Sequence, residues 1–137
     1  MRYLIDTNIL IRLVGEQDAI SKDVWDILND TDNLFYVSTI SIQEIFMLMQ
    51  EGVLKIKQWQ KPNDVFRYIE NEFCCAIKCV EKEHLLTFGK LSHIQNHNDP
   101  FDRMIIAQAI TEKMALISSD RKFRKYCSQG LEFIPNY

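Results

Sequence analysis

The decisive stretch of this chain is Asn98-Asp99-Pro100-Phe101-Asp102-Arg103-Met104-Ile105-Ile106-Ala107-Gln108-Ala109. Two carboxylates and a proline open a helix that is otherwise largely apolar. A helix packed into a core rarely keeps a carboxylate at its buried end unless that charge is paired or binds a metal. The stretch therefore points to a functional site, to which acids from elsewhere in the chain can contribute.

The length and composition predict one globular domain over residues 1–137. The chain has 137 residues, of which 47 % are hydrophobic, and this is enough for a sizeable core. It has no run of about 18 apolar residues, so no membrane span is expected. Charged residues enter too soon at the N-terminus for a secretory signal. We therefore expect a cytoplasmic protein.

Charge and cysteine content narrow the class further. The net charge of −3 argues against a passive nucleic-acid-binding module, because the only dense basic run is Arg121–Lys125. The four cysteines show no zinc-ligand spacing, and two of them are adjacent, which suits a disulfide framework poorly. Buried, reduced thiols are expected at these positions: Cys74, Cys75, Cys79 and Cys127.

Strands and helices alternate along the chain. Short apolar strands are predicted over 2–5, 34–37, 75–80 and 115–117, with a last edge strand over 131–134. Helices are predicted over 8–14, 18–29, 39–51, 62–72, 81–91, 100–113 and 120–126. Because the strands are continuous apolar runs, they favour a parallel sheet covered on both faces. The prediction is an α/β fold with a central, mainly parallel sheet of about four to five strands.

Four acids are expected at one edge of this sheet. Asp6 directly follows the first strand, Asp120 follows the fourth, Glu44 lies in the first turns of the helix after the second strand, and Asp102 lies in the first turn of its own helix. Ligands of open α/β sheets bind beyond the carboxyl ends of the strands. Each acid alone has a simpler explanation as a helix cap or a partly exposed side chain. Their convergence is what indicates a site.

Clustered carboxylates of this kind predict bound divalent cations. Like charges within about 4–6 Å raise one another's pKa or require a cation. Oxygen ligands suit Mg²⁺ or Mn²⁺ better than zinc, which prefers histidine and cysteine. One such ion, or two about 4 Å apart, can activate water and stabilise in-line displacement at a phosphodiester.

Helix phase separates the two acids of the decisive stretch. Asp99 with Pro100 after it fits an N-cap, and Asp99 is also a candidate contact to a metal-bound water. Asp102 shares a helical face with apolar positions that face the core, so it is expected to point inward as a metal ligand does. Those apolar positions are Ile105, Ile106, Ala109 and Ile110.

Five polar residues are secondary candidates. Thr7, Asn8 and Ser118 can hydrogen-bond the carboxylates or metal waters, although local turn hydrogen bonds are the competing explanation. His97 can contact substrate phosphate or be a loop residue with a structural hydrogen bond. Arg103 can pair with a site carboxylate or a phosphate, or lie on a solvated helix face.

Two other phosphate-handling classes are disfavoured. The chain has no glycine-rich phosphate loop, which argues against a P-loop or Rossmann nucleotide site. A haloacid-dehalogenase-type phosphatase places a second aspartate two residues after the first, where this chain has Asn8.

The ordered motifs resemble PIN-domain ribonucleases, and most closely the VapC-type toxins of bacterial and archaeal toxin–antitoxin modules. The resemblance covers essentially the whole chain. It rests on the ordered segments Asp6-Thr7-Asn8, Ser41-Ile42-Gln43-Glu44-Ile45, His97 to Ala109, and Leu116-Ile117-Ser118-Ser119-Asp120.

This resemblance implies a three-layer α/β/α fold and Mg²⁺- or Mn²⁺-dependent endonucleolytic cleavage of RNA. The family's acidic quartet corresponds to Asp6, Glu44, Asp102 and Asp120, and Ser118 stands where the family commonly has threonine. The resemblance also implies a homodimer and a cognate antitoxin that occludes the site.

Two alternatives remain open at this point. One is a PIN nuclease of RNA maturation that has no antitoxin. The other is a non-catalytic RNA- or protein-binding module in which the acids only cap helices.

Overall fold

Five short strands form one parallel sheet in the computed structural model, which describes residues 1–137. The strands are β1 (Arg2–Ile5), β2 (Leu34–Ser38), β3 (Ala76–Lys78), β4 (Ala115–Ser118) and β5 (Glu132–Pro135). Their order in the sheet is β3-β2-β1-β4-β5, and every neighbouring pair is parallel. The predicted parallel sheet is confirmed, and the 131–134 segment joins it as the edge strand β5.

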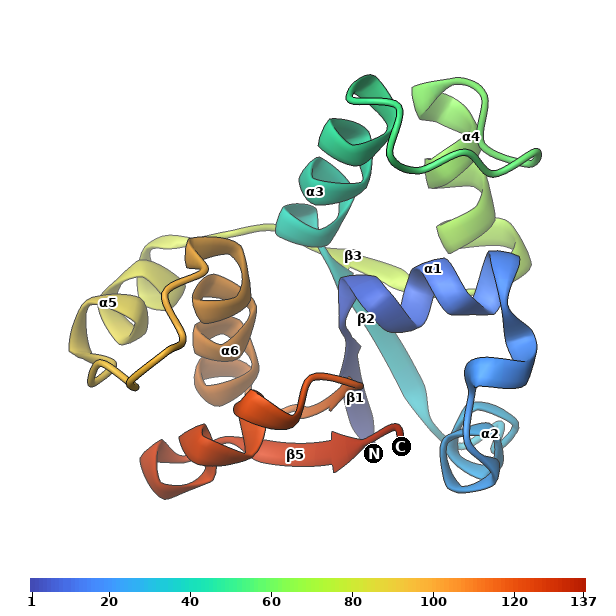
Figure 1. The fold of residues 1–137 in the computed structure, drawn as a ribbon. Coiled ribbons are helices and arrows are strands. Elements are labelled where there is room, and N and C mark those ends of the chain that lie inside the picture. Colours follow the sequence, from blue (N-terminus) through green and yellow to red (C-terminus); the bar gives the residue numbers. More distant parts are fainter.

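Helices cover both faces of this sheet, which gives the predicted three layers (Figure 1). The α-helices are α1 (Thr7–Gly15), α2 (Lys22–Leu28), α3 (Thr39–Gln50), α4 (Pro62–Arg67), α5 (Lys82–Lys90) and α6 (Pro100–Glu112). In Figure 1, α1, α2 and α4 lie on one side of the sheet and α5 and α6 on the other. None of these helices combines the length and the apolar character needed to cross a membrane.

Three shorter helical segments complete the fold. The 3₁₀ turn η1 (Gln17–Ala19) precedes α2, and the π-helical turn η2 (Tyr68–Glu72) extends α4. The 3₁₀ helix η3 (Arg121–Gln129) follows β4 and ends at Gly130, whose φ of 105° is the left-handed conformation that glycine adopts easily.

Most observed boundaries lie close to the predicted ones, and two of the differences have a visible structural reason. The helix predicted over 18–29 begins only at Lys22, because the Ser21 hydroxyl accepts the Val24 N–H and caps it there. The strand predicted over 75–80 is only three residues long. Cys74, just before it, has a left-handed φ of 52°, and β3 pairs with β2 alone as the edge strand on its side of the sheet.

Alternation along the central strands divides the core between the two faces. Tyr3 and Ile5 pack into a cluster beneath α1, α2 and α3, whereas Leu4 packs into a second cluster with α6 and η3. Leu116 on β4 joins that second cluster. Both faces of the sheet are therefore buried, which explains why the strands read as unbroken apolar runs.

The expectation of four buried thiols is wrong. Only Cys75 is buried, and its pKa is raised to about 12, mainly by that burial. Cys74, Cys79 and Cys127 are exposed, and none of the four forms a disulfide. They lie at the margins of β3 and on the outer side of η3, where the general tendency of cysteine to be buried does not apply.

Glu112, at the end of α6, ties this helix to other elements. Its Oε2 lies 2.7 Å from Nε2 of His84, a fully buried side chain on α5. The Nδ1 atom of His84 accepts the Glu81 N–H, so the proton of the neutral ring is on Nε2 and is donated to Glu112. The other carboxylate oxygen of Glu112 lies 3.1 Å from Lys78 Nζ.

We predict that Glu112→Ala destabilises the fold. The substitution leaves the Nε2–H of His84 buried without its acceptor, which costs about 1–3 kcal/mol of unfolding free energy. The matched control is Glu83→Ala, at an exposed glutamate of the same helix pair, which should change stability by no more than about 0.5 kcal/mol. Urea unfolding measures both values, and equal stability of the two variants would contradict the assignment.

Candidate active site

The pairing of β1 with β4 places Asp6 beside Ser118 at the carboxyl ends of the strands. Ile5 pairs with Ile117, and the Asp6 N–H donates to the Ile117 carbonyl at 3.0 Å. The Ser118 hydroxyl donates to Asp6 Oδ2 at 2.6 Å. The sheet order reverses direction at this point, with β2 and β4 on opposite sides of β1, which is where open α/β sheets bind ligands.

Asp6 is held by further hydrogen bonds and is only 2 % exposed. Its Oδ1 accepts the Thr7 N–H at 2.8 Å, which caps α1, and its Oδ2 accepts from Asn8 Nδ2 at 3.1 Å. Asn8 and Ser118 thus contact a site carboxylate directly and do not only close local turns. The carboxylate of Asp6 consequently has one fixed orientation.

Asp120 is joined to the same group through Ser118. The Asp120 N–H donates to Ser118 Oγ at 3.0 Å, so one hydroxyl bridges Asp6 and the segment that carries Asp120. The Asp120 side chain also accepts the Lys122 N–H at 2.9 Å and so caps η3. Asp120 is therefore a helix cap and a neighbour of Asp6 at the same time.

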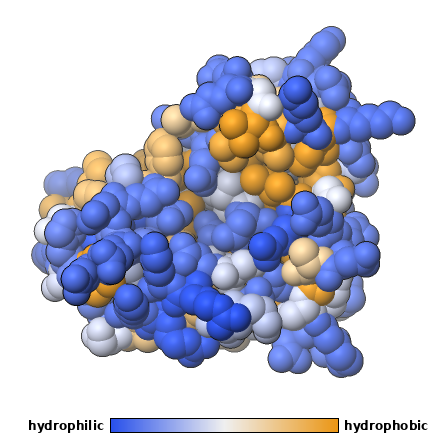
Figure 2. Space-filling model, in the orientation of Figure 1, coloured by the Kyte–Doolittle hydropathy of each residue, from blue (hydrophilic) through white to orange (hydrophobic).

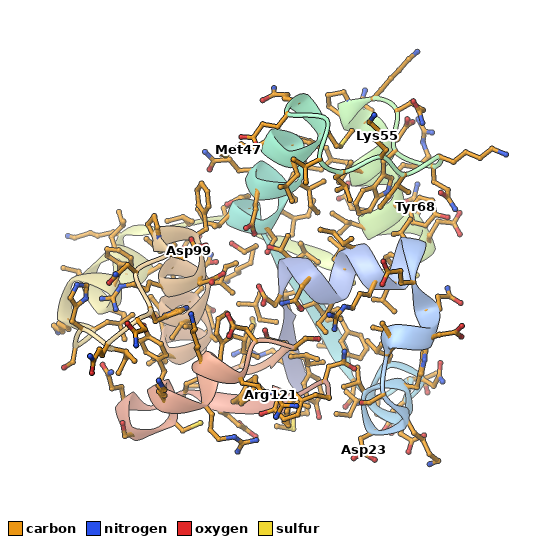
Figure 3. All side chains as sticks on the ribbon, viewed as in Figure 1. Asp23, Met47, Lys55, Tyr68, Asp99 and Arg121 are labelled. Atoms are coloured by element: carbon orange, nitrogen blue, oxygen red, sulfur yellow. The ribbon has the colours of Figure 1, made fainter.

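Asp99 and Asp102 take the separate positions that helix phase predicts. Asp99 Oδ1 accepts the N–H groups of Phe101 at 2.9 Å and Asp102 at 3.4 Å, which caps α6. Figure 3 labels Asp99 at the end of α6 nearest α3. Asp102 points inward, and its side chain is 19 % exposed.

Five carboxylates line a single pocket of about 220 Å³. Glu44 reaches it from α3, and the Thr7 hydroxyl is directed toward Glu44, buried and without a well-aligned hydrogen bond. The pocket contains no lysine, arginine or histidine among its lining residues, which are Asp6, Thr7, Asn8, Ile11, Glu44, Leu48, Asp99, Asp102 and Asp120. Its negative charge is therefore not compensated by the protein.

Burial and mutual repulsion raise the pKa values of these acids. Burial, followed by the charges of Asp6, Asp99, Glu44 and Asp120, raises the pKa of Asp102 to about 8. The pKa of Asp6 rises to about 6, chiefly through burial, although its hydrogen bonds oppose the rise. The pKa of Glu44 is raised as well, again mainly by burial. Without a cation, the pocket thus favours protonated acids.

The donor set fits a hard divalent cation. The lining offers carboxylate oxygens from four separate elements, together with the buried hydroxyl of Thr7. Asp102 and Asp120, with His97 beside them, each place a potential ligand atom so that all three atoms lie within 4.8 Å of one another. Oxygen-rich sites of this kind suit Mg²⁺ or Mn²⁺.

His97 is a loop residue with structural hydrogen bonds, one of its two predicted roles, whereas Arg103 takes neither of its predicted positions. His97 is 3 % exposed, and its Nδ1 lies 2.6 Å from the Tyr126 hydroxyl while its Nε2 lies 3.4 Å from Asp102 Oδ2. Burial lowers the pKa of His97, which favours the neutral ring. Arg103 is 8 % exposed and bonds the Tyr126 hydroxyl, at 3.2 Å, and no site carboxylate. Neither residue is a solvated position facing substrate.

Tyr126 is the residue beside the site that sequence reasoning missed. It is fully buried in η3, where it packs with Phe123 in the core cluster beneath α6. The spacing of Phe123 and Tyr126 signals one apolar helix face, but the hydroxyl was the further clue, because a buried tyrosine O–H needs a partner.

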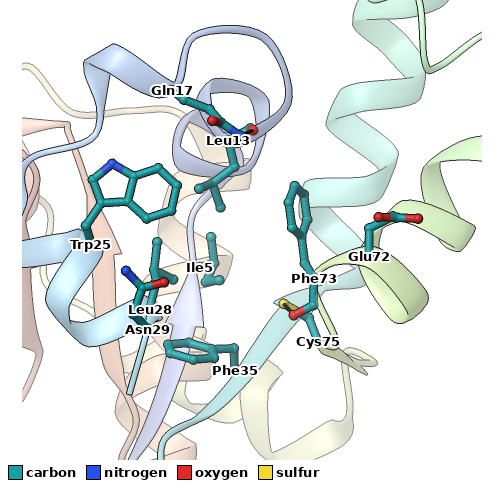
Figure 4. Close-up of a pocket in the computed structure, with 10 residues that line it drawn as sticks. All are labelled: Ile5, Leu13, Gln17, Trp25, Leu28, Asn29, Phe35, Glu72, Phe73 and Cys75. Carbon is teal, nitrogen blue, oxygen red and sulfur yellow. Dashed lines mark hydrogen bonds between the residues drawn. The ribbon is translucent and has the colours of Figure 1, made fainter. Parts of the chain in front are cut away.

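A second pocket, of about 280 Å³, has a different character (Figure 4). Its walls are mainly apolar, and Figure 4 shows Trp25, Phe35 and Phe73 around it. Glu72 is the only carboxylate among the lining residues. This pocket has no metal-ligand set, so the acidic pocket is the candidate active site.

Comparison with known proteins identifies the fold family. The PIN domain model matches residues 3–129. No curated protein sequence matches the chain.

Solved structures show the same fold over the full length. The chain is similar to one in the crystal structure of VapBC2 from Rickettsia felis bound to a promoter DNA fragment, with a TM-score of 0.70, 20 % identity and 100 % of both chains covered. For a chain of VapBC-1 from nontypeable Haemophilus influenzae the TM-score is 0.67 and the identity 20 %, with 98 % of both chains covered. A third similar structure is VapBC-5 from Mycobacterium tuberculosis, a member of the VapBC family of toxin–antitoxin systems. Its TM-score is 0.59 and its identity 15 %, with 98 % of both chains covered. Identities this low establish the fold alone.

The raised pKa of Asp102 predicts how the stability of the metal-free protein depends on pH. Because the folded pKa of about 8 exceeds the ordinary 3.8, folded Asp102 keeps a proton that the unfolded chain releases. Its stabilising contribution is complete below pH 3.8 and is lost as the pH rises through about 8. In EDTA, wild type should therefore lose more unfolding free energy than Asp102→Asn between pH 5.5 and 8.5, by about 1–3 kcal/mol.

The control for this comparison is Asp23→Asn, at an exposed acid in the first turn of α2. Its pH profile from urea unfolding should run parallel to that of wild type. Parallel profiles for Asp102→Asn and wild type would show that the pKa of Asp102 is not raised.

Proposed function

The chain belongs to the PIN domain family, and we propose that it is a divalent-metal-dependent endoribonuclease that acts as the toxin of a toxin–antitoxin pair. PIN domains are generally nucleases, so a hydrolase acting on nucleic acid follows from the family. The observation that carries the finer proposal is the uncompensated pocket of five carboxylates at the carboxyl ends of β1 and β4. A helix-capping role alone does not explain why these acids share one pocket.

We assign the holding of Mg²⁺ or Mn²⁺ to Asp6, Glu44, Asp102 and Asp120, with Asp99 assisting through an intervening water. A bound divalent ion supplies Lewis-acid activation of water and stabilises charge at the phosphodiester during in-line displacement. Asp6, fixed by hydrogen bonds from Thr7, Asn8 and Ser118, presents the remaining lone pair of its Oδ1 without reorganising.

Asp102 manages a proton in this proposal. Its carboxyl group, with a pKa of about 8, carries a proton at neutral pH when no cation is present. Cation binding therefore displaces that proton and makes the apparent affinity rise with pH. Ser118 keeps its own hydroxyl proton directed at Asp6 throughout.

The proposed partners are an antitoxin that occludes the pocket and a second copy of the chain. Ile11 and Leu48 line the acidic pocket beside its carboxylates. Figure 2 shows a hydrophobic area on the surface between α3 and α4, where Phe46, Met49 and Ile56 are only partly buried. A protein segment with apolar side chains and one basic side chain would suit both surfaces. The toxin–antitoxin membership of a structural relative supports the same partner.

Removing a single site carboxylate should abolish cleavage while the fold persists. We predict that Asp6→Asn and Asp102→Asn each reduce Mn²⁺-dependent cleavage of a total RNA pool to below about 1 % of the wild-type rate. Each variant loses a ligand of the cation, and with the cation it loses the stabilisation of the charge that develops at the phosphodiester. The reaction is followed by 5′-end sequencing, which also maps the cleavage positions.

Asp23→Asn provides the matched control, because Asp23 lies on α2 and does not line the acidic pocket (Figure 3). It should cleave at the wild-type rate. Undiminished cleavage by both purified site variants would overturn the proposed function.

An antitoxin encoded beside this gene should copurify with the chain. We expect the product of a small neighbouring frame, coexpressed with the chain, to bind it and to inhibit RNA cleavage in proportion to the amount bound. Gel filtration and the same cleavage assay measure the two effects. Active enzyme with no inhibitory neighbour would instead support a PIN nuclease of RNA maturation.

A further inference from the structure

A hydrogen-bond network of three buried polar side chains leads from the protein interior to Asp102 in the acidic pocket. Arg103 Nη1 lies 3.2 Å from the Tyr126 hydroxyl, Tyr126 lies 2.6 Å from His97 Nδ1, and His97 Nε2 lies 3.4 Å from Asp102 Oδ2. Arg103, Tyr126 and His97 are each less than 9 % exposed. None of the three is among the residues that line the pocket, and Asp102 is the lining residue to which His97 is hydrogen-bonded.

The direction of every hydrogen bond in this network follows from Arg103. A guanidinium has five N–H donors and no acceptor, so Tyr126 must accept from it. The tyrosine hydroxyl has a single proton, and His97 Nδ1 is the only acceptor within reach. His97 Nδ1 therefore accepts, the ring proton of the neutral imidazole is on Nε2, and this N–H donates to Asp102.

The opposite arrangement is unfavourable at Tyr126. If His97 donated from Nδ1, the Tyr126 O–H would be buried with no acceptor, which is a costly state for a polar group. The observed contacts are all satisfied by one direction only, from Arg103 outward.

Further contacts fix the geometry of this network. Arg103 also donates to the carbonyls of Leu91 and Ser92, at 3.4 Å and 3.5 Å. The His97 ring packs at steep angles against Phe123 and Tyr126, with ring centroids 5.7 Å and 5.3 Å away. The imidazole plane is therefore held by its neighbours as well as by its hydrogen bonds.

We propose that Arg103, Tyr126 and His97 are positioning residues. Arg103 and Tyr126 hold His97 as the Nε2–H tautomer, and His97 in turn orients the Asp102 carboxylate for cation binding. His97 supplies the only hydrogen bond to the Asp102 side chain, so without it that carboxylate is free to rotate. Hydrogen-bond partners behind a metal ligand commonly change metal affinity about 10- to 100-fold. This inference rests on the proposed metal-dependent function, and it excludes His97 Nε2 as a ligand.

The tautomer is tested directly by two-bond ¹H–¹⁵N correlation spectroscopy of the whole protein labelled with ¹⁵N-histidine. His97 should carry its proton on Nε2, and the exposed His93 provides a reference signal. In Tyr126→Phe, the signal of His97 should change to a mixture of tautomers. A proton on Nδ1 of His97 in the wild type would overturn the proposal.

Metal binding is tested by titrating Mn²⁺ into the protein in a calorimeter, with no RNA present. Tyr126→Phe and His97→Asn should each weaken the affinity about tenfold or more. His97→Gln should stay within about threefold of wild type, because its Nε2 reaches the position of the imidazole Nε2 and can donate to Asp102. A merely structural role would not separate glutamine from asparagine at this position.

Two results of the titration would overturn the proposal. Wild-type affinity in both Tyr126→Phe and His97→Asn would show that Asp102 needs no orienting group. Equal loss in His97→Gln and His97→Asn would show that the imidazole itself binds the ion. If Tyr126→Phe fails to fold in thermal unfolding, the two His97 variants carry the test. Failure of the wild type to bind Mn²⁺ would overturn the proposed function and leave the tautomer prediction standing.

Discussion

Uncompensated negative charge is the constraint on which this structure depends. Five carboxylates share one pocket, and no cationic side chain is among the residues that line it. Protonation relieves part of the repulsion among these carboxylates, since the pKa of Asp102 rises to about 8 and that of Asp6 to about 6. A divalent cation would relieve the rest, because it converts mutual repulsion into shared coordination.

The fold concentrates this charge by giving three of the five acids a second, structural function. Asp6, Asp99 and Asp120 each accept a backbone N–H at the start of a helix, so each is anchored where its helix begins. The pairing of β1 with β4 then brings two of these helix starts together, joined through Ser118. The same contacts therefore cap the helices and bring these acids into one pocket.

Periodicity predicted much of this arrangement, and contacts between distant loops account for the rest. The strand pattern is sufficient for the parallel sheet, and helix phase places Asp102 inward. The path of residues 91–98 has no periodic signal, so the burial of His97 and its contact with Tyr126 were not predictable. Arg103 follows Asp102 in a motif, yet its side chain turns to the carbonyls of that loop. Composition likewise gave the wrong burial for Cys79, since it carries no information about local geometry.

The central claim is that the acidic pocket is a divalent metal site built from distant carboxylates. The most direct test is a crystal structure of the protein soaked in Mn²⁺, with anomalous diffraction locating the ion. We expect an anomalous peak among Asp6, Glu44, Asp102 and Asp120, with the Nε2 atom of His97 outside the coordination shell of the ion. A fully soaked crystal without a peak among these carboxylates, or with the ion bound elsewhere, would contradict the central claim.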